Sequence, residues 1–558
     1  MFNKFKNAVL NGLNSKMQKR FILIGTLIGF ILSIAMIPSE LVLAKMLPGK
    51  NNDTFNIYVK LPSGSSISQT KEVTSCVIKY VQQEKEVRNT EVFLGMGSPL
   101  DFAGLIKGSH FKNSENVAEI VLNLSKKHNR IEPSYMMVQR MRPMIQNSCE
   151  KIYSGTKVSF VEPPAGPPVM AAIVAEVYGN NAEGIRHIAS RIEKVFKNTK
   201  GLVDIDIMQD DIYDKFEIEV DSIKIARSGL DVKQVNDILY LAFEGMEIAV
   251  KNSDIYDDQL PIFLTLSSET KAFSKKTQSA INAKLVSLKL MNNQGMMVPV
   301  TEVVKIVPVK SNPMIVSKNL HQMTNVMAET DMVSQVYPLM DARNKILDSF
   351  TDEYEVTKVG LFNLELKDKK TAQVYKLIWD GEMEVTLDTF VELGAAFIAA
   401  LILIFLLMVI YYKSFKLSAI ILLGSFLSII GVIVGHFIMD VFTKDTFFLT
   451  ATSLIGFIAL IGISSRNSLL LIDFTKSLMF DKGMSQKEAI AFSTATRAKP
   501  IFLTAVAIIL ASTLLASDAV FGGLGVALIF GTIAAVIASL IVVPVLMDNI
   551  NLQEEFSK

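Results

Sequence analysis

The residues best suited to chemistry are polar side chains set in apolar sequence near the end of the chain. Arg466 and Asn467 interrupt one apolar stretch, and Asp473 follows Arg466 by seven residues. Seven residues are two helical turns, about 10.5 Å along the axis, which puts Arg466 and Asp473 on one face but too far apart to pair directly. Arg497 and Thr504 share the same spacing. An ionised group in a bilayer is costly unless it faces protein or water, so these residues need partners and are candidate functional residues.

Metal chemistry has little support in the sequence. Two cysteines are too few for a zinc cluster, and the five histidines show no metal-ligand spacing. The histidines are His110, His128, His187, His321 and His436. We therefore expect no metal centre and no cofactor, and we interpret His436 as an interfacial or packed residue.

The methionines and cysteines of the first half each admit two interpretations. Met137, Met141 and Met144 have the i, i+4, i+7 spacing of one helix face. Thioethers suit Cu(I), but a packed core face has the same spacing, and we favour the core. Cys76 and Cys149 fall on two expected helices, and they either form a disulfide in an oxidising compartment or are two buried small residues, the interpretation we favour.

The composition suits a chain that lies in two solvents. Of the 558 residues, 50% are hydrophobic and 20% are charged. The 56 Lys and Arg against 55 Asp and Glu give a net charge of +1, so no bulk field attracts nucleic acid. We therefore expect no nucleic-acid partner.

Six charge-free stretches are candidates for membrane spans, because a bilayer core needs roughly 20 mostly apolar residues per helix. The stretches are 21–39, 393–412, 417–439, 447–465, 501–517 and 519–547. The first lacks an A-x-A-like cleavage site and follows a twenty-residue lead, so we expect an uncleaved anchor rather than a signal peptide.

The basic residues between these stretches predict which side each loop occupies. Those of the lead and of the loops after the second and fourth spans gather on one side, whereas the opposite short loops carry only Lys444. The first group is Lys4, Lys6, Lys16, Lys19, Arg20, Lys413, Lys416, Lys476, Lys482, Lys487, Arg497 and Lys499. By the positive-inside rule both termini are cytoplasmic, so residues 40–388 form an outer block.

The outer block has the pattern of repeated strand–helix–strand units. Strands are expected at 55–61, 91–95, 117–124 and 157–161, with one helix that follows the turn "PSGSS" and runs to about residue 84 and another near 134–150. Two such units make a split βαβ sheet of the ferredoxin-like type. The stiff segment "PPAGPP" (163–168) is a linker. The pattern then returns with strands at 172–179, 202–208, 324–330 and 354–360, helices at 182–198 and 333–349, and an insertion over 216–310.

Four motifs together resemble the carboxy-terminal half of an RND (resistance–nodulation–cell division) efflux transporter of the AcrB-like, hydrophobe/amphiphile type, over nearly the whole chain. They are "GPPVMAAIVAEVYG" (166–179), "WDGEMEVTLDTFVELGAAF" (379–397), "ATSLIGFIALIGISSRNSLLLIDF" (451–474) and "TRAKPIFLTAVAIIL" (496–510). The expected fold is an α-helical bundle of six transmembrane helices with a large α+β periplasmic domain of ferredoxin-like βαβ subdomains, in the inner membrane.

The expected domain map follows from these patterns and the resemblance. The membrane part comprises a cytoplasmic amphipathic lead (1–20), transmembrane helices at 21–39, 417–439, 447–472, 501–517 and 522–547, a pre-membrane segment with a further span (379–412), a cytoplasmic amphipathic helix (474–499) and a tail (548–558). The periplasmic part comprises one porter subdomain (40–162), a second (163–215 and 311–378) and an inserted docking-type subdomain (216–310).

The resemblance implies a proton-relay site containing Arg466, Asn467, Asp473, Arg497 and Thr504. In that family the proton-carrying carboxylates come from the amino-terminal half, so the resemblance implies an amino-terminal-half partner chain. It also implies a trimeric assembly, a periplasmic adaptor, an outer-membrane channel, contact with membrane lipid and amphiphilic small molecules as cargo. The expected activity is proton-driven secondary transport, not enzymatic, and no "GxxxxGK[ST]" phosphate loop occurs in the sequence.

Several interpretations stay open at this point. Arg466 is either a relay residue or a side chain that snorkels to the headgroups. Better-known drug pumps of the family carry lysine there, and arginine does not release its proton as lysine can. Asp473 either carries protons or fixes the helix end. The whole chain is alternatively a SecD-like protein-export subunit, although "SRN" (465–467) stands where that family has an acidic "DAN" motif, or an inactive truncated remnant.

Overall fold

The computed structural model describes residues 2–49, 51–99, 104–105, 112–163, 166, 169–255, 259–271, 277–331, 333–443, 446–518 and 520–557. His110, Lys444 and most of the expected linker 163–168 lie outside this part of the chain. The protein divides into two compact units, and they are described separately. The larger unit is Met1–Gln209 with Ile315–Lys558, and the smaller is Asp210–Met314.

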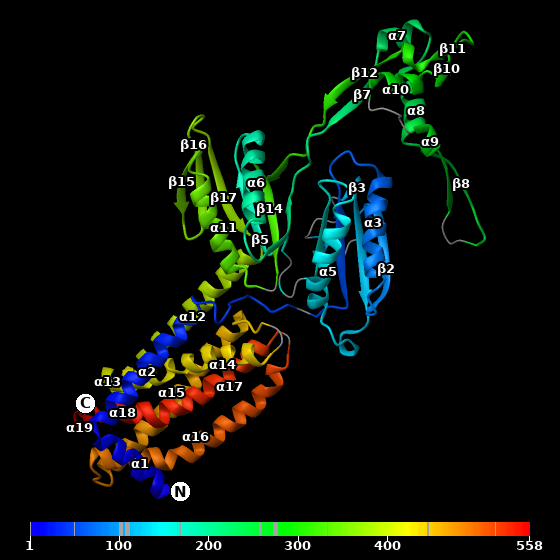
Figure 1. Cartoon of the computed structure of the whole chain (residues 1–558). Coiled ribbons are helices and arrows are strands. Elements are labelled where there is room, and N and C mark those ends of the chain that lie inside the picture. Colours follow the sequence, from blue (N-terminus) through cyan, green and yellow to red (C-terminus); the bar gives the residue numbers. More distant parts are fainter. Residues whose placement is uncertain are drawn as a thin grey trace. The chain divides into compact units, whose positions relative to one another are not determined.

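The first αβ subdomain of the larger unit is a four-stranded antiparallel sheet in the order β2-β3-β1-β4, with α3 and α5 packed against it (Figure 1). Its elements are β1 (Thr54–Lys60), α3 (Ile67–Val81), β2 (Val87–Met96), β3 (Asn113–Leu124), α5 (Ser134–Cys149) and β4 (Lys157–Val161). Side chains alternate across a strand, so Phe55, Ile57 and Val59 of β1 all enter the core.

The helices of this subdomain decide the two interpretations of its sulfur residues. Cys76 of α3 and Cys149 of α5 form a disulfide, so the expectation of two free buried cysteines is wrong. The two helices pack side by side, which brings residues 73 positions apart in sequence together. Met137 and Met141 lie in the same core, whereas Met144 is 47% exposed, so the three do not share one surface.

The second αβ subdomain has a seven-stranded antiparallel sheet in the order β13-β14-β5-β17-β16-β15, with β6 paired to β14. Its elements are β5 (Ile173–Tyr178), α6 (Ala182–Lys197), β6 (Leu202–Ile207), β13 (Val316–Lys318), β14 (His321–Thr330), α11 (Val336–Ser349), β15 (Tyr354–Val359), β16 (Asn363–Asp368) and β17 (Val374–Asp380). The hairpin β16–β17 was not expected. It buries Leu364 and Leu366 by alternation and runs past the expected domain boundary at 378.

The smaller unit is built on the antiparallel pair β7 and β12, with short helices between them. Its elements are β7 (Asp214–Val220), α7 (Ser222–Arg227), α8 (Val232–Phe243), β8 (Met246–Lys251), β9 (Leu260–Leu264), α9 (Ser268–Lys271), α10 (Gln278–Leu285), β10 (Lys289–Met291), β11 (Met297–Pro299), η3 (Val300–Glu302) and β12 (Val304–Lys310). Val235, Leu285, Val300 and Val303 form its core.

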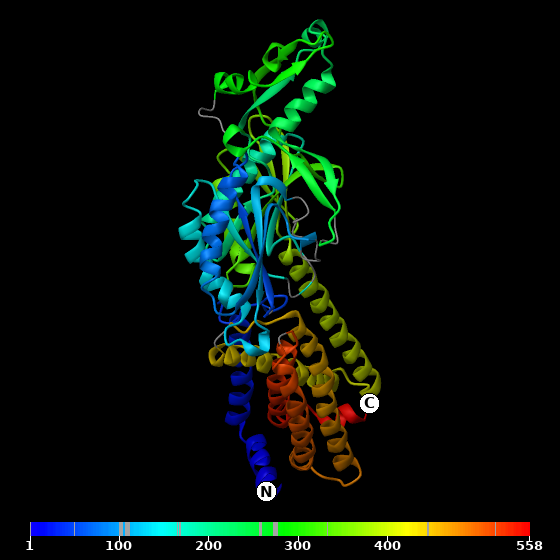
Figure 2. The same cartoon turned by 90° about the vertical axis from the view of Figure 1, so that its right-hand side faces the viewer.

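Six helices or helix pairs in the described residues are long and apolar enough to cross a membrane. They are α2 (Lys16–Ala35), α12 (Glu382–Tyr412), α13 with α14 (Phe415–Phe426 and Ser428–Phe442), α15 (Ala451–Phe480), α16 (Gln486–Ala516), and α17 with the π turn η4 and α18 (Gly522–Ile537, Ala538–Val542 and Val543–Asp548). Two short helices flank them: α1 (Phe2–Asn14) and α19 (Leu552–Phe556). Both views show α12 as one long helix leading from β17 into the helical bundle (Figure 2).

We expected a cytoplasmic helix over 474–499 and a separate span over 501–517, but the structure does not divide the chain in this way. Helix α15 continues to Phe480, and α16 is one helix that runs through Pro500 to Ala516. Ser485 is the N-cap residue of α16, and its hydroxyl donates to the Glu488 carboxylate at 2.8 Å. The first half of α16 packs against α1 and α18, and proline is tolerated where neighbouring helices support the backbone.

The disulfide gives a first testable prediction. Replacing Cys76 and Cys149 with serine should lower the stability of the first subdomain by about 2–5 kcal/mol, because the cross-link restricts a long loop in the unfolded chain. Thermal unfolding of the purified chain in detergent measures this. A reductant should lower the midpoint of the wild type and leave the double variant unchanged. An unchanged wild-type midpoint, with reduction verified by mass, would contradict the prediction.

Candidate functional site

The middle of α15 carries a buried polar row inside the helical bundle. Ser464, Ser465, Asn467 and Ser468 are all buried. The Ser465 hydroxyl shares a hydrogen bond of 2.9 Å with that of Ser425 on α13, and the Ser464 hydroxyl donates to the Gly424 carbonyl at 3.2 Å. Small hydroxyl side chains let the two helices approach closely. These two bonds satisfy Ser465 and Ser464, whereas the Ser468 hydroxyl is buried without a hydrogen-bond partner among the described residues.

Arg466 differs from this row because it is exposed on α15. Its neighbours Ser465 and Asn467 face the interior of the bundle, at 6% and 5% exposed. Consecutive residues of a helix are turned by about 100° from one another, so Arg466 must point to a different face. The guanidinium therefore lies on an outer face of this bundle.

Asp473 is tied to a neighbouring helix. Its carboxylate accepts a hydrogen bond of 2.7 Å from the Tyr412 hydroxyl at the end of α12. Tyr412 and the adjoining Leu471 and Ile472 are buried, so this bond sits at the edge of a packed cluster. The contact ties α15 to the end of α12. Because α15 continues to Phe480, Asp473 does not lie at the end of its own helix, contrary to the interpretation of it as a residue that fixes that end.

The two candidates on α16 occupy separate surroundings. The Arg497 guanidinium lies over the Phe474 ring of α15, 5.0 Å from its centroid. Thr504 is exposed, and its hydroxyl donates to the carbonyls of Pro500 and Ile501 in its own helix. Among Arg466, Asn467, Asp473, Arg497 and Thr504, all within the described residues, no hydrogen bond or ion pair joins any two. The structure therefore does not assemble these five into one site.

A buried polar network at another level of the bundle involves His436, which is fully buried on α14. Its Nε2 is 2.9 Å from the Ser453 hydroxyl and its Nδ1 is 2.8 Å from the Val432 carbonyl. Thr450 and Thr452 extend the network to the Val520 carbonyl. His436 is thus a packed residue with both ring nitrogens satisfied.

A second charged cluster joins the two αβ subdomains, and sequence reasoning missed it. Arg142 of α5 contacts Asp204 of β6 at 3.0 Å and Asp331 at 3.2 Å. Gln146 also donates to Asp204, at 2.9 Å. Asp204 and Ile205 together face the single residue Ala328 of β14 in a β-bulge, which redirects the Asp204 side chain toward α5.

The same interface has a second set of ion pairs around Asp206. Lys60 and Lys157 of the first subdomain approach its carboxylate at 2.8 and 2.9 Å, and Lys157 also contacts Glu193 of α6 at 2.8 Å. Burial alone would raise the pKa of Asp206, but the two lysines lower it. The sequence signal for this site was the pair of aspartates in the otherwise apolar strand "LVDIDIM", which marks one charged strand face.

Glu162 lies beside this interface, and its pKa is shifted in the opposite direction to that of Asp206. Burial raises its pKa to about 7, against the opposing effect of Arg142 and of a hydrogen bond from Ser134 at 3.4 Å. Burial raises the pKa of Asp204 as well. The interface therefore contains carboxyl groups whose pKa values are moved in opposite directions.

These features define a class of protein. Long apolar helices joined to two αβ subdomains of this kind are the fold of a multi-pass membrane permease: two crystal forms of a heavy-metal efflux pump match with a TM-score of 0.72 at 20% and 19% identity. The match covers 97% of this chain and 51% of the pump. A family model described as the AcrB/AcrD/AcrF family matches residues 1–550. The chain belongs to this family of RND efflux permeases.

Curated relatives are more distant in sequence and longer. The swarming motility protein SwrC of Bacillus subtilis is 24% identical over 67% of this chain and 32% of its own length. The multidrug resistance protein MdtC of Erwinia tasmaniensis is 24% identical over 66% of this chain and 33% of its own length. The nickel and cobalt resistance protein CnrA of Cupriavidus metallidurans is 24% identical over 74% of this chain and 36% of its own length. The chain spans about a third of these relatives and half of the solved pump.

The raised pKa of Glu162 gives a pH-dependent prediction. Its pKa lies above the ordinary value of 4.5, so its contribution to stability is present below about pH 4.5 and is lost as pH rises through about 7. Glu162→Gln should therefore stabilise the protein by about 1–3 kcal/mol at about pH 8 and have little effect at low pH. Thermal unfolding at both pH values measures the difference.

Glu193→Gln is the matched control for this prediction. Burial alone would raise the pKa of Glu193, but its hydrogen bonds with Lys157 and Lys197 lower it. Its stabilisation is therefore present above the unfolded pKa and lost as pH falls, so this variant should be destabilised at about pH 8. Equal effects of Glu162→Gln at both pH values would refute the assignment.

Proposed function

We propose that this chain is one half of a proton-driven RND efflux transporter that exports amphiphilic small molecules across the inner membrane. The observation that carries the proposal is the pattern of coverage: nearly the whole chain matches, but it matches only half of a solved pump. Transporters of this kind are built from two parallel repeats about an axis along the membrane normal. One repeat is what this chain supplies.

The position of Arg466 supports the need for a second repeat. A cation in the bilayer interior requires partners, and Arg466 is exposed on this bundle. The family resemblance places the proton-carrying carboxylates in the amino-terminal half. We propose that the partner chain covers Arg466 and Thr504 and supplies those carboxylates, because arginine itself does not release a proton.

The chemistry of the described residues favours amphiphiles over metal ions as cargo. No three His, Cys, Asp or Glu side chains gather as metal ligands within the described ranges. Met137 and Met141, which could pass soft cations, are core residues. Relatives include both multidrug and nickel–cobalt resistance proteins, so the choice rests on this chain's own side chains.

Placement of the αβ subdomains in the periplasm has two supports. The disulfide between Cys76 and Cys149 suits an oxidising compartment. The distribution of basic residues among the loops predicts that the opposite ends of the helices are cytoplasmic.

Assembly is supported by the smaller unit. Its β8–β9 hairpin leaves Ile248, Ile262 and Phe263 exposed at 54%, 46% and 60%. Such an apolar hairpin suits insertion into a neighbouring subunit. We include a trimer, a periplasmic adaptor and an outer-membrane channel in the proposal, by analogy with the family.

A substitution series tests the role of Arg466. Arg466→Ala should reduce proton-dependent dye export at least about tenfold, because the cation's interaction with the partner is lost. Thr504→Ala should also reduce proton-dependent dye export. Arg466→Lys keeps the charge and should retain export. Asp473→Asn should reduce export less than Arg466→Ala, because the Asp473 carboxylate is already bonded to the Tyr412 hydroxyl at the end of α12. Export is measured in cells that also express the amino-terminal half, with membrane levels checked by immunoblot. Normal export by Arg466→Ala at a normal membrane level would favour snorkelling and overturn the relay assignment.

Reconstitution tests the half-transporter proposal directly. The purified chain alone in proteoliposomes should show no dye transport when a proton gradient is imposed, because the Asp473 carboxylate is bonded to the Tyr412 hydroxyl and Arg466 is only a fixed cation. The same chain reconstituted with an amino-terminal-half chain should transport. Transport by the lone chain would show that it is a self-sufficient homo-oligomer and would refute the proposal.

A further inference from the structure

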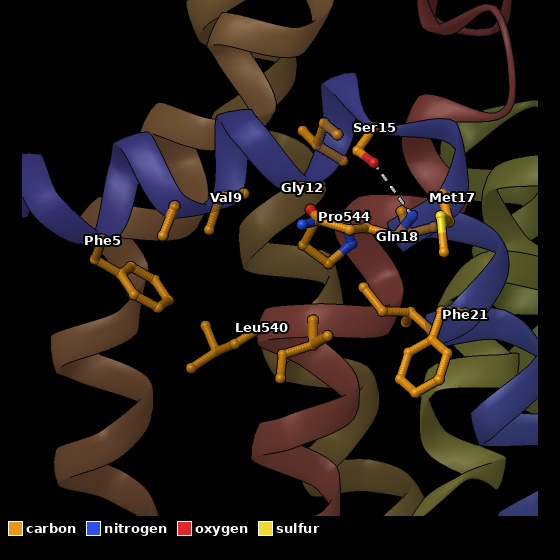
Figure 3. Close-up of a pocket in the computed structure, with 14 residues that line it drawn as sticks. Phe5, Val9, Gly12, Ser15, Met17, Gln18, Phe21, Leu540 and Pro544 are labelled. Carbon is orange, nitrogen blue, oxygen red and sulfur yellow. Dashed lines mark hydrogen bonds between the residues drawn. The ribbon is translucent and has the colours of Figure 1, made fainter.

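An apolar cavity of about 630 Å³ lies where the two ends of the membrane part meet. Its walls come from α1, from the first turns of α2, and from the π turn and α18 at the end of the last span (Figure 3). Phe5, Val9 and Gly12 form one side, with Phe21, Leu540 and Pro544 around the remainder. The cavity belongs to neither the candidate relay nor the subdomain interface.

Local sequence features explain why this space is not filled. Ser15 ends α1, adopts an extended conformation and caps α2 by accepting from the Gln18 N–H at 3.3 Å, so the chain turns between the two helices (Figure 3). The π turn Ala538–Val542 widens the opposite helix just before Pro544. Gly12 has no side chain to occupy the gap. Chain direction and backbone geometry thus hold the cavity open.

The lining identifies the kind of ligand. Of the fourteen lining residues, only Ser15 and Gln18 have polar side chains, and the volume is within the range of about 300–1,000 Å³ that is typical of small-molecule sites. Met17 and Phe21 border the cavity and are 83% and 78% exposed, so the apolar lining continues onto the outer surface of α2. A hydrocarbon chain matches this continuous apolar surface.

The border of the cavity is positively charged. Lys16 and Arg20 immediately precede Met17 and Phe21, and both are exposed. They lie four residues apart, so they share one face of α2. Lys19 is different, because it forms an ion pair of 2.8 Å with Asp548, whose side chain is only 3% exposed. That pair joins α2 to α18 beside the cavity and leaves Lys16 and Arg20 as the cations of the border.

We propose that this cavity is a binding site for an anionic phospholipid, with an acyl chain in the cavity and the headgroup phosphate at Lys16 and Arg20. Basic residues next to an apolar cleft between helices at the cytoplasmic surface are the chemistry that recognises acidic lipids. An uncharged amphiphile would use the cavity without the two cations. The inference rests on α2 and the last span crossing a bilayer, as the proposed function has it, but not on transport, so it is tested by binding alone.

Native mass spectrometry of the detergent-purified full chain tests the site, with phosphatidylglycerol or phosphatidylcholine of the same acyl chains as probes. Wild type should prefer phosphatidylglycerol by roughly thirtyfold, the contribution of two surface cations. Lys16→Gln with Arg20→Gln should reduce this preference to near unity. Gly12→Leu should weaken binding of both lipids at least about tenfold, because a modest added apolar volume excludes a well-fitted chain.

The glycine change has a matched control. A Cβ on Gly12 meets only the Gln18 side chain, at 3.7 Å, so a leucine there enters the cavity without backbone strain. Gly25 on α2 has nothing within 4 Å of its Cβ and does not line the cavity, so Gly25→Leu should bind lipid as the wild type does. Ile541→Trp fills the cavity from the opposite wall and should reproduce the loss.

Three results would overturn the proposal. They are full lipid binding by both Gly12→Leu and Ile541→Trp, equal binding of the two lipids by wild type, and cross-linking of a phosphatidylglycerol with a photoreactive acyl chain to helices other than α1, α2 and α18. Failure of transport leaves these binding results unaffected. In the same way, absence of phosphatidylglycerol binding by wild-type protein that transports would refute this site while leaving the proposed function intact.

Discussion

The cost of leaving a charged or polar group unsatisfied in a bilayer is the constraint on which the membrane part of this protein depends. It explains why Ser464 and Ser465 of α15 bond to α13, why Asp473 accepts from Tyr412, and why both nitrogens of His436 are occupied. Arg466 stands apart from these satisfied groups. Because its face of α15 is exposed, the constraint has to be met by something other than this helical bundle.

Close backbone packing is the means by which the bundle meets that constraint with few polar contacts. Helix α17 lies against α14 and α15 at glycines: a Cβ on Gly431 would come within 2.3 Å of the Phe530 carbonyl, and one on Gly456 within 2.7 Å of the Ala527 Cβ. Lipid tails are as apolar as leucine, so van der Waals packing rather than water exclusion holds such helices together. Replacing these glycines would separate the helices that position the polar row.

Much of this fold could be predicted from sequence, because hydrophobic period and span length depend on local residues. The strands β1, β3 and β4, the helices α3 and α5, and the long apolar helices are of this kind. Two features could not be predicted from local residues: α16 continues through Pro500, and the Arg142–Asp204 pair joins residues 62 positions apart. Sequence identified polar candidates such as Thr504 and Asp473, but their separation in space was visible only in the structure.

The two charged regions of the chain differ in whether their cations have a carboxylate partner. Between the αβ subdomains, Arg142, Lys60 and Lys157 each reach a carboxylate of the opposite subdomain, so that interface is electrostatically complete within one chain. In the helical part, where an uncompensated charge costs more, Arg466 has no such carboxylate among the described residues. If the chain is one half of a transporter, as we propose, the face of α15 that carries Arg466 is where the second repeat packs, because no carboxylate of the described residues approaches that cation.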